Sequence, residues 1–203
     1  MTLSLSLIGR IVKGLQWSSD IVVEVAQGIS MKSVLLEEKR TIIKRWIDLT
    51  VDTYPPESGS FLRNQKDQFA NPVGAAIAQG AEALFDWVIG DSQEYGPVVV
   101  RRLDDIVRIR AVQQFSASNA VAFVFLLKKS IRDGIPKQFL KDPDRFGELL
   151  KIESRIDSLA LTAFDMYMKC REKLFEMRAM EIRNRTSRIL ERACNKYGAP
   201  HEW

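Results

Sequence analysis

The fold class is decided by the stretch 142–198, which reads DPDRFGELLKIESRIDSLALTAFDMYMKCREKLFEMRAMEIRNRTSRILERACNKYG. It begins with Asp-Pro, a helix start signal, because Asp accepts hydrogen bonds from free N–H groups and proline fits the first helical position. Between Pro143 and Gly198, Gly147 is the only glycine and there is no further proline. The stretch therefore predicts one helix of about 50 residues, roughly 75–80 Å long.

One apolar stripe runs along this helix at a spacing of roughly 3.7 residues, which is nearer a straight helix than a strict heptad. Its members are Ile156, Ala160, Ala163, Tyr167, Cys170, Leu174, Ala179, Ile182, Thr186, Ile189 and Ala193. We expect the first half to pack on a helical bundle. The second half, from about Phe175, projects and needs a partner, most simply the same helix of a second copy. The residues predicted for dimerisation or docking are Leu174, Ile182, Ile189, Arg185 and Arg188.

The preceding sequence also reads as helices. Apolar residues recur at helical spacing from about Ser33 to Asp52, and Tyr54-Pro55-Pro56 ends that helix. Further helices are expected from Asn71-Pro72 to Gly90 and from about residue 97 to residue 113. A helix starting at Ser116 is apolar nearly all round, which predicts a buried central helix. The expected fold class is all-α.

Composition excludes several classes of protein. Of the 203 residues, 46% are hydrophobic and 28% charged, which is typical of a globular chain rather than a disordered one. No apolar run approaches the roughly 18 residues that span a bilayer. Two cysteines are too few for a disulfide scaffold, so we expect a cytoplasmic protein.

The sequence also lacks the residues of common catalytic and cofactor sites. His201 is the only histidine and lies outside the expected helices, which excludes a His-ligated haem and a His-rich metal site. Neither Gly-rich phosphate loop, GxGxxG or GxxxxGK[ST], occurs. Cys170 and Cys194 lie about 36 Å apart along one helix, too far to share a metal. We therefore expect no enzyme activity, no cofactor and no metal.

The positive charge is concentrated near the C-terminus. Between Lys169 and Lys196 there are nine basic and four acidic residues, so this segment carries a charge of +5. Because the net charge of the chain is +4, the rest of the chain carries −1. Interspersed acids such as Glu181, four residues before Arg185, fit a solvated helix surface with local ion pairs. A basic helix also suits a protein partner, nucleic acid or an anionic membrane. We expect a protein partner and no nucleic acid.

Residues 1–30 differ from the rest of the chain and show neither a long apolar core after a basic start nor a small-residue cleavage site. A well-formed helical pattern follows Met31 at once. We expect residues 1–30 to be a poorly ordered arm or an upstream extension, with natural translation starting at Met31. An intact mass matching a start at Met1 would contradict that start.

Polar residues are dense around the ends of the apolar helices. Within the segment 108–113, at least one of Arg108, Arg110 and Gln113 is expected to face the core, where a buried arginine must be paired. Its candidate partners are Asp67, Asp104, Asp105 and the carbonyls near Asn71. Two interpretations remain open: a structural network that fixes the connector 54–71, or a small pocket for an anionic ligand. The candidate site residues are Tyr54, Lys66, Asp67, Asn71, Arg108, Arg110 and Gln113.

Several short motifs in combination resemble one known family. They are Trp46, Tyr54-Pro55-Pro56, Phe61-Leu62, Lys66-Asp67, the segments 69–74, 108–113 and 120–129, and Phe115-Ser116. Together they resemble, over about residues 34–135, the N-terminal domain of RsbRD-type co-antagonist proteins. The resemblance implies a non-haem, globin-like helical sensor that dimerises and is joined by a helix to a STAS domain in bacterial stress signalling. No strand-rich STAS segment follows here.

The sequence thus predicts a globin-like helical bundle followed by a long projecting C-terminal helix. We expect an N-terminal extension at 1–30, a sensor domain at 31–165 and a basic helical arm at 166–203. The predicted function is a non-enzymatic sensory or regulatory module of bacterial signalling, acting through helix packing as a homodimer and through a protein partner. The alternative is a scaffold or accessory subunit that docks its C-terminal helix on a larger complex, such as a membrane-associated redox complex.

Overall fold

The computed structural model describes residues 30–65, 67–137 and 139–198, and the predictions made for residues 1–29 and for Lys66 lie outside it. All regular structure in the described part is helical, which confirms the all-α class. The helices are α3 (Met31–Glu37), α4 (Lys39–Val51), α5 (Pro56–Asn64), α6 (Pro72–Ile89), α7 (Pro97–Val112), α8 (Ala117–Gly134), the short 3-10 helix η1 (Phe139–Lys141) and α9 (Pro143–Tyr197).

The helix boundaries follow the capping signals in the sequence. Asn71, Ser116 and Asp142 each accept a hydrogen bond from a backbone N–H in the first turn of α6, α8 and α9. Gly198 ends α9 in the left-handed conformation with φ of 67°, which glycine adopts without a steric penalty. The single long helix predicted for 143–198 is therefore confirmed, and α9 has 55 residues.

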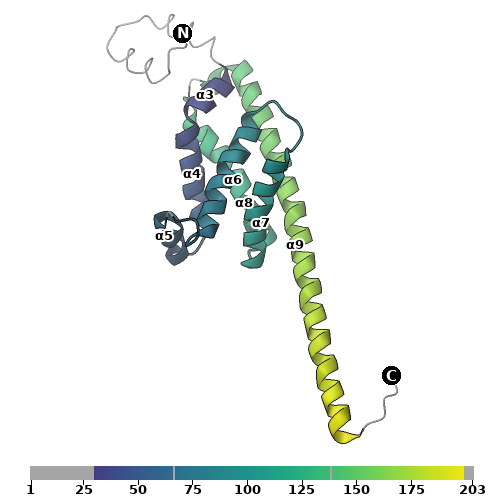
Figure 1. Ribbon diagram of the computed structural model, residues 1–203. Helices are drawn as coiled ribbons and strands as arrows, with labels where there is room; N and C mark the ends of the chain where they lie inside the picture. Colours follow the sequence, from purple (N-terminus) through teal and green to yellow (C-terminus); the bar gives the residue numbers. More distant parts are fainter. Residues whose placement is uncertain (1–29, 66, 138, 199–203) are drawn as a thin grey trace, which may run out of the picture.

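The bundle is formed by α4, α6, α7, α8 and the first half of α9. Helix α6 packs on α7, α8 packs on α4, and α9 packs on both α7 and α8. The second half of α9 continues well beyond the bundle, and α5 lies at the side near the end of α4 (Figure 1). Tyr167 is the last fully buried side chain along α9. This arrangement fits the expected globin-like bundle with a projecting C-terminal helix.

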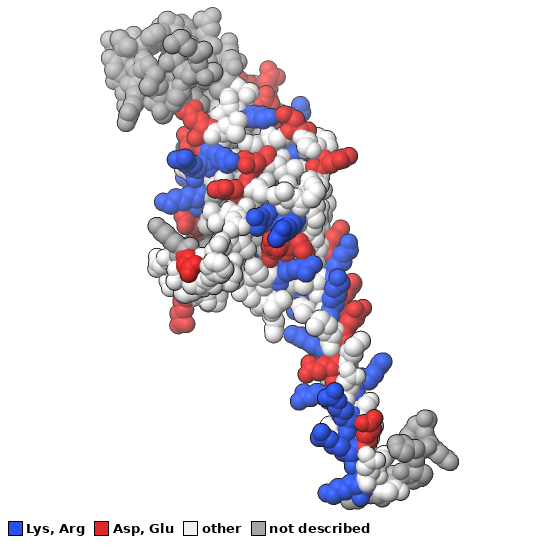
Figure 2. Space-filling model, in the orientation of Figure 1, with Lys and Arg blue, Asp and Glu red and all other residues white. Residues whose placement is uncertain are grey.

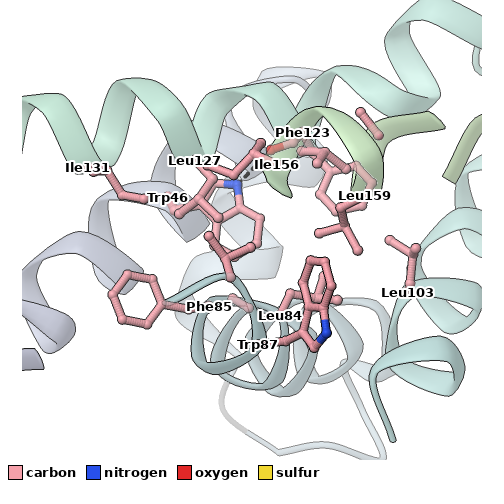
Figure 3. Packing of buried hydrophobic residues seen from close by; sticks show 14 of the residues in the cluster. Trp46, Leu84, Phe85, Trp87, Leu103, Phe123, Leu127, Ile131, Ile156 and Leu159 are labelled. Atoms are coloured by element: carbon pink, nitrogen blue, oxygen red, sulfur yellow. Dashed lines mark hydrogen bonds between the residues drawn. The ribbon is translucent and has the colours of Figure 1, made fainter. Parts of the chain in front are cut away.

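The core is built on two parallel rings at the crossing of α4 and α8. Trp46 stacks on Phe123 with ring centroids 6.4 Å apart, and its indole N–H donates to the Phe123 carbonyl oxygen at 2.6 Å. Leu84, Leu127 and Ile156 lie in the same buried cluster (Figure 3). These buried side chains bring together four helices, α4, α6, α8 and α9, from distant parts of the sequence.

Close approach of helices needs glycine at one position in particular. A side-chain carbon at Gly80 would lie 2.5 Å from the end of the Ile106 side chain, so α6 and α7 approach each other closely here. A larger residue at this position would require the Ile106 side chain or the helices to shift.

Two details differ from the sequence-based expectation. The helix expected from Ser33 to Asp52 is broken at Glu38 into α3 and α4, and no proline or glycine there signals the break. Helix α8 is not buried all round: Phe125 is 47% exposed, because no helix of the described chain covers that face. The connector 54–71 contains a short helix, α5.

Candidate functional site

The most unusual buried side chain is Arg110, in the last turn of α7. Its exposed fraction is 0%, although it is a charged residue. It follows Ile106 and Val107 and precedes Ala111, which are all buried, so its own helical position also faces the core. The prediction that at least one polar residue of the segment 108–113 faces the core is confirmed, and Arg110 is that residue.

The guanidinium of Arg110 is held by three oxygen atoms from two other segments of the chain. It donates to the Thr50 carbonyl oxygen at 3.3 Å and to the Thr53 hydroxyl at 2.8 Å, both at the end of α4. It also donates to the Asn119 carbonyl oxygen at 3.0 Å in the first turn of α8. One side chain therefore ties the ends of α4 and α7 to the start of α8.

Three aromatic rings enclose the same guanidinium. Its carbon lies 5.0 Å from the ring centroid of Tyr54, 4.9 Å from that of Phe115 and 5.3 Å from that of Phe123. Tyr54 and Phe115 also meet edge to face at 5.2 Å. Aromatic faces attract cations most strongly where water is excluded. We call Arg110, Thr50, Thr53, Tyr54, Phe115, Phe123 and Asn119 the arginine cage.

The cage places a positive charge in the interior without a negative one. Within the described chain, Arg110 forms hydrogen bonds but no ion pair, and its Nε has no partner. Burial lowers the pKa of Arg110, because it disfavours the charged guanidinium. Burial also raises the pKa of Tyr54, an effect that the neighbouring guanidinium of Arg110 opposes, and no hydrogen bond of ordinary geometry reaches the Tyr54 hydroxyl.

The carboxylates predicted as partners of Arg110 bind elsewhere, so this part of the expectation is wrong. Asp104 pairs with Arg108 at 2.6 Å, one helical turn away. Asp105 lies 3.8 Å from Arg102, and Asp67 accepts from the Phe69 N–H in its own turn. All three carboxylates lie on the surface of their own helix or turn, where a neighbouring donor is nearer than the core.

The remaining candidates do not gather around Arg110, with the exception of Tyr54. Arg108 and Gln113 are exposed, and Gln113 is the C-terminal cap residue of α7. Asn71 is buried and joins α5 to α6: its side chain donates to the carbonyl oxygens of Leu62 and Gln65, both at 2.9 Å, and accepts from the Gly74 N–H at 2.8 Å. Its role is therefore to fix the connector, as the structural-network interpretation expects.

The arginine cage is connected to α9 through the corner between α7 and α8. Gln114 in this corner has φ of 63°, a conformation that residues other than glycine seldom adopt. The Tyr167 hydroxyl donates to the Phe115 carbonyl oxygen at 2.6 Å, and Arg171 donates to the Ala111 carbonyl oxygen at 3.3 Å. These two bonds are made on α9 just before it leaves the bundle.

Sequence reasoning missed most of the residues around Arg110. Thr50, Thr53 and Asn119 contribute carbonyl or hydroxyl oxygens, and residue type does not reveal which backbone oxygen faces a cation. A signal did exist for Phe115, which lies beside the α8 cap residue Ser116 in a motif that the resemblance used. An aromatic residue next to a helix cap, five residues after a core-facing arginine, could have suggested a cation–π contact.

The predicted docking residues lie on the projecting half of α9, which we call the arm (residues 171–197). Ile182 and Ile189 are each 65% exposed, Arg185 and Arg188 are exposed, and Leu174 is half-buried. Figure 2 shows basic side chains over much of the arm, interspersed with fewer acidic ones. Apolar and basic side chains therefore share one exposed helix.

Two searches of the described residues gave no candidate site. No group of three or more histidine, cysteine, aspartate or glutamate side chains is placed to hold a metal ion among residues 30–65, 67–137 and 139–198. Across the same residues, no helix combines the length and apolar character needed to cross a membrane.

Comparison with known proteins gives one family. The model of the RsbT co-antagonist protein rsbRD N-terminal domain matches residues 40–182, well over half of the chain. A protein of Archaeoglobus fulgidus, described only as uncharacterized, is 28% identical over 149 residues, which cover 71% of this chain and 84% of that protein. No solved structure matches the chain. The matched segment contains the arginine cage and continues into the arm.

Proposed function

The chain belongs to the family of RsbT co-antagonist protein rsbRD N-terminal domains, and on this basis we propose that it is a non-enzymatic sensory module of bacterial signalling. The family implies a regulatory role of the stressosome type. In this proposal the arginine cage responds to a signal, and α9 transmits the response to a protein partner in the cytoplasm. The supporting observation is the hydrogen-bonded path from the cage to the point where α9 leaves the bundle.

The input side of this path is the turn that follows α4. Thr53 and Tyr54 cover Arg110, and α5, which comes next, buries only Gly59. A segment with few buried contacts opens at little free-energy cost. Displacement of this turn exposes a cation that has no counter-charge, so an anionic ligand or an acidic partner segment would stabilise the displaced form.

The output side is the corner between α7 and α8. Phe115 contacts Arg110 with its ring and Tyr167 with its carbonyl oxygen, and Ala111 accepts from Arg171. A rearrangement of the cage that moves Phe115 therefore breaks or shifts the bonds that position α9. A ligand drives such a change only if it binds one arrangement more tightly than the other.

We also propose that the module is a homodimer that uses the exposed face of α8 and α9. Lys128 and Asp157 pair across these antiparallel helices at 2.6 Å. One turn further along the same surface lie Phe125, 47% exposed, and Leu161, 71% exposed. Contiguous exposed apolar side chains of this size mark an interaction surface. Sedimentation tests the dimer: Leu161→Glu should yield monomers, and an unchanged mass would contradict this face.

Hydrogen exchange tests the coupling between the cage and α9. Tyr54→Ala, which opens one wall of the cage, should speed exchange of amides in residues 167–175 more than a matched control does. The control is Leu35→Ala, which removes a buried side chain of α3 that does not contact the cage. The two variants are compared at equal residual stability. Equal acceleration by both would show that only global stability changed, and the coupling would be rejected.

A further inference from the structure

One exposed row of apolar side chains continues along α9 from the bundle to the end of the arm. Its members follow one another at intervals of seven residues: Leu161, Met168, Phe175, Ile182 and Ile189. Phe175 is 59% exposed, and Ile182 and Ile189 are each 65% exposed. Ala179, Thr186 and Ala193 fill the positions four residues after the last three members. This spacing of core positions is typical of a helix that packs against another helix.

A second row, of arginines, flanks the apolar row on one side. Arg171, Arg178, Arg185 and Arg192 also recur every seven residues, each three positions after an apolar member. Neighbours in this row are about 10.5 Å apart along the helix axis. In the part of the chain that the structure describes, Arg178, Arg185 and Arg192 form no ion pair, although Glu181 lies within one turn of the first two. The charges of these three arginines are therefore available to a partner.

A second copy of the arm is a poor partner for this surface. In a parallel, in-register pair, a flanking residue faces the residue five positions later on the other helix, so Arg178 of one copy faces Arg183 of the other, whereas Arg171 faces Glu176 and Arg185 faces Leu190. In an antiparallel pair, the arginine row faces itself. Isoleucine at the positions of Ile182 and Ile189 also disfavours two-stranded parallel packing. The antiparallel orientation therefore places like charges opposite one another along the whole row, and the parallel orientation does so at Arg178 and Arg183.

We propose that the arm binds an amphipathic α-helix of a different protein, with acidic residues along the flank that meets the arginine row. Charges at flanking positions select the partner of such a helix and its orientation. On the other flank, Glu176 precedes Arg183 and Leu190, so only one edge is uniformly basic. Both edges would contact a membrane or a nucleic acid, and the negative charge of Glu176 would oppose that binding. An acidic helix needs to match only the arginine edge.

A synthetic four-heptad helix tests the proposal on the full-length protein. It carries leucine at its core positions and glutamate at its flanking positions, and its control carries lysine in place of glutamate. Binding is followed by fluorescence polarisation of the labelled peptide at low and at high salt. The acidic peptide should bind, the basic one should not, and about 0.5 M NaCl should weaken the binding strongly, because exposed charges are screened.

Two double variants with equal charge change provide the matched comparison. R178E/R185E alters the arginine row and should weaken binding about thirtyfold. K173E/R188E alters basic residues on the opposite face and should change it less than about threefold. Arg188 was among the docking residues predicted from the sequence, but its spacing from Ile182 and Ile189 places it away from the apolar row, so this proposal does not include it. All four positions lie on the arm, and circular dichroism checks that helix content is unchanged. Neither variant touches the dimer face proposed at Phe125 and Leu161, so sedimentation separates a failure of this proposal from a failure of that one.

Three outcomes would overturn the proposal. Failure of the acidic peptide to bind at high micromolar concentration rejects the partner chemistry. Equal losses in the two double variants indicate a general charge attraction, and tighter binding to anionic vesicles than to the peptide assigns the arm to a membrane. Loss of dimer mass in Ile182→Asp would assign the apolar row to a second copy.

Discussion

The two halves of α9 carry similar apolar patterns in different surroundings. Between Leu149 and Tyr167 the helix lies against the bundle, and its inward side chains, such as Leu159, are buried. Beyond Arg171 the same kinds of side chain, such as Ile182, are exposed. Periodicity therefore shows that a face is suited to being covered, whereas the position where the bundle ends decides which part of that face is free for a partner.

The largest expected effect is a difference in stability between the two halves. Leu159→Ala should lower the free energy of unfolding by about 2–5 kcal/mol, because it leaves a cavity in the bundle. Ile182→Ala on the arm should change it by less than about 0.5 kcal/mol. Urea unfolding followed by circular dichroism measures both. Similar losses from the two substitutions would mean that the arm is also packed.

A pair of arginines extends the comparison to charged residues. Arg110→Met should destabilise the fold by about 3 kcal/mol, because the carbonyl oxygens of Thr50 and Asn119 lose a buried donor. Arg185→Met, at an exposed position, should leave unfolding within about 0.5 kcal/mol of the wild type. Thermal and urea unfolding of both variants provide the check. An Arg110→Met protein as stable as the wild type would show that the arginine cage does not stabilise the fold.

The contact between α8 and the bundle half of α9 should show an intermediate effect. Arg132 donates to both carboxylate oxygens of the buried Glu153, at 2.6 and 2.7 Å. Glu153→Gln keeps the shape but removes the charge and one acceptor, so we expect a loss of about 1–2 kcal/mol. The matched control is Glu181→Gln on the arm, which should have no measurable effect. A neutral Glu153→Gln would show that solvent replaces the lost bond.

The smallest expected effect concerns the Tyr54 hydroxyl and depends on pH. At neutral pH, Tyr54→Phe should keep or raise stability by up to about 1 kcal/mol, because the buried hydroxyl has no partner. Burial raises the pKa of Tyr54 in the folded protein. The neutral phenol therefore contributes stability that is fully present below the unfolded pKa of about 10 and is lost as pH rises through the folded pKa.

Urea midpoints at pH 7 and at about pH 10.5 test this sign. The wild type should lose more stability between the two values than Tyr54→Phe does. A larger loss in the variant would contradict the buried, neutral state of Tyr54. Because the two proteins differ only at residue 54, the difference between their losses isolates the contribution of its hydroxyl.

Local signals predicted the helices well and the site only in part. Asn71-Pro72, Asp142-Pro143 and Gly198 gave the ends of α6 and α9, because capping depends on residues close in sequence. The break at Glu38 was not predictable, because no local breaker marks it. The exposed face at Phe125 was also missed, because apolar character alone does not show where a neighbouring helix stops.

The cage shows the same division between local and tertiary information. That at least one of Arg108, Arg110 and Gln113 faces the core followed from the apolar residues around them. Its partners did not follow, because an acidic residue was the expected counterpart, whereas the fold supplies carbonyl oxygens and ring faces brought together from α4, α7 and α8. Backbone oxygens have no signature in sequence, so only the assembled structure identifies them.

Hydrogen exchange along α9 of the full-length protein, in the absence of any partner, distinguishes a half of the helix that is packed on the bundle from a half that is free. Amides near Leu159 should exchange only through global unfolding, whereas those near Ile182 should exchange at least about a hundredfold faster through local opening. Equal protection from Leu149 to Ile189 would contradict the account, because the arm would then be covered by its own bundle or by a second copy.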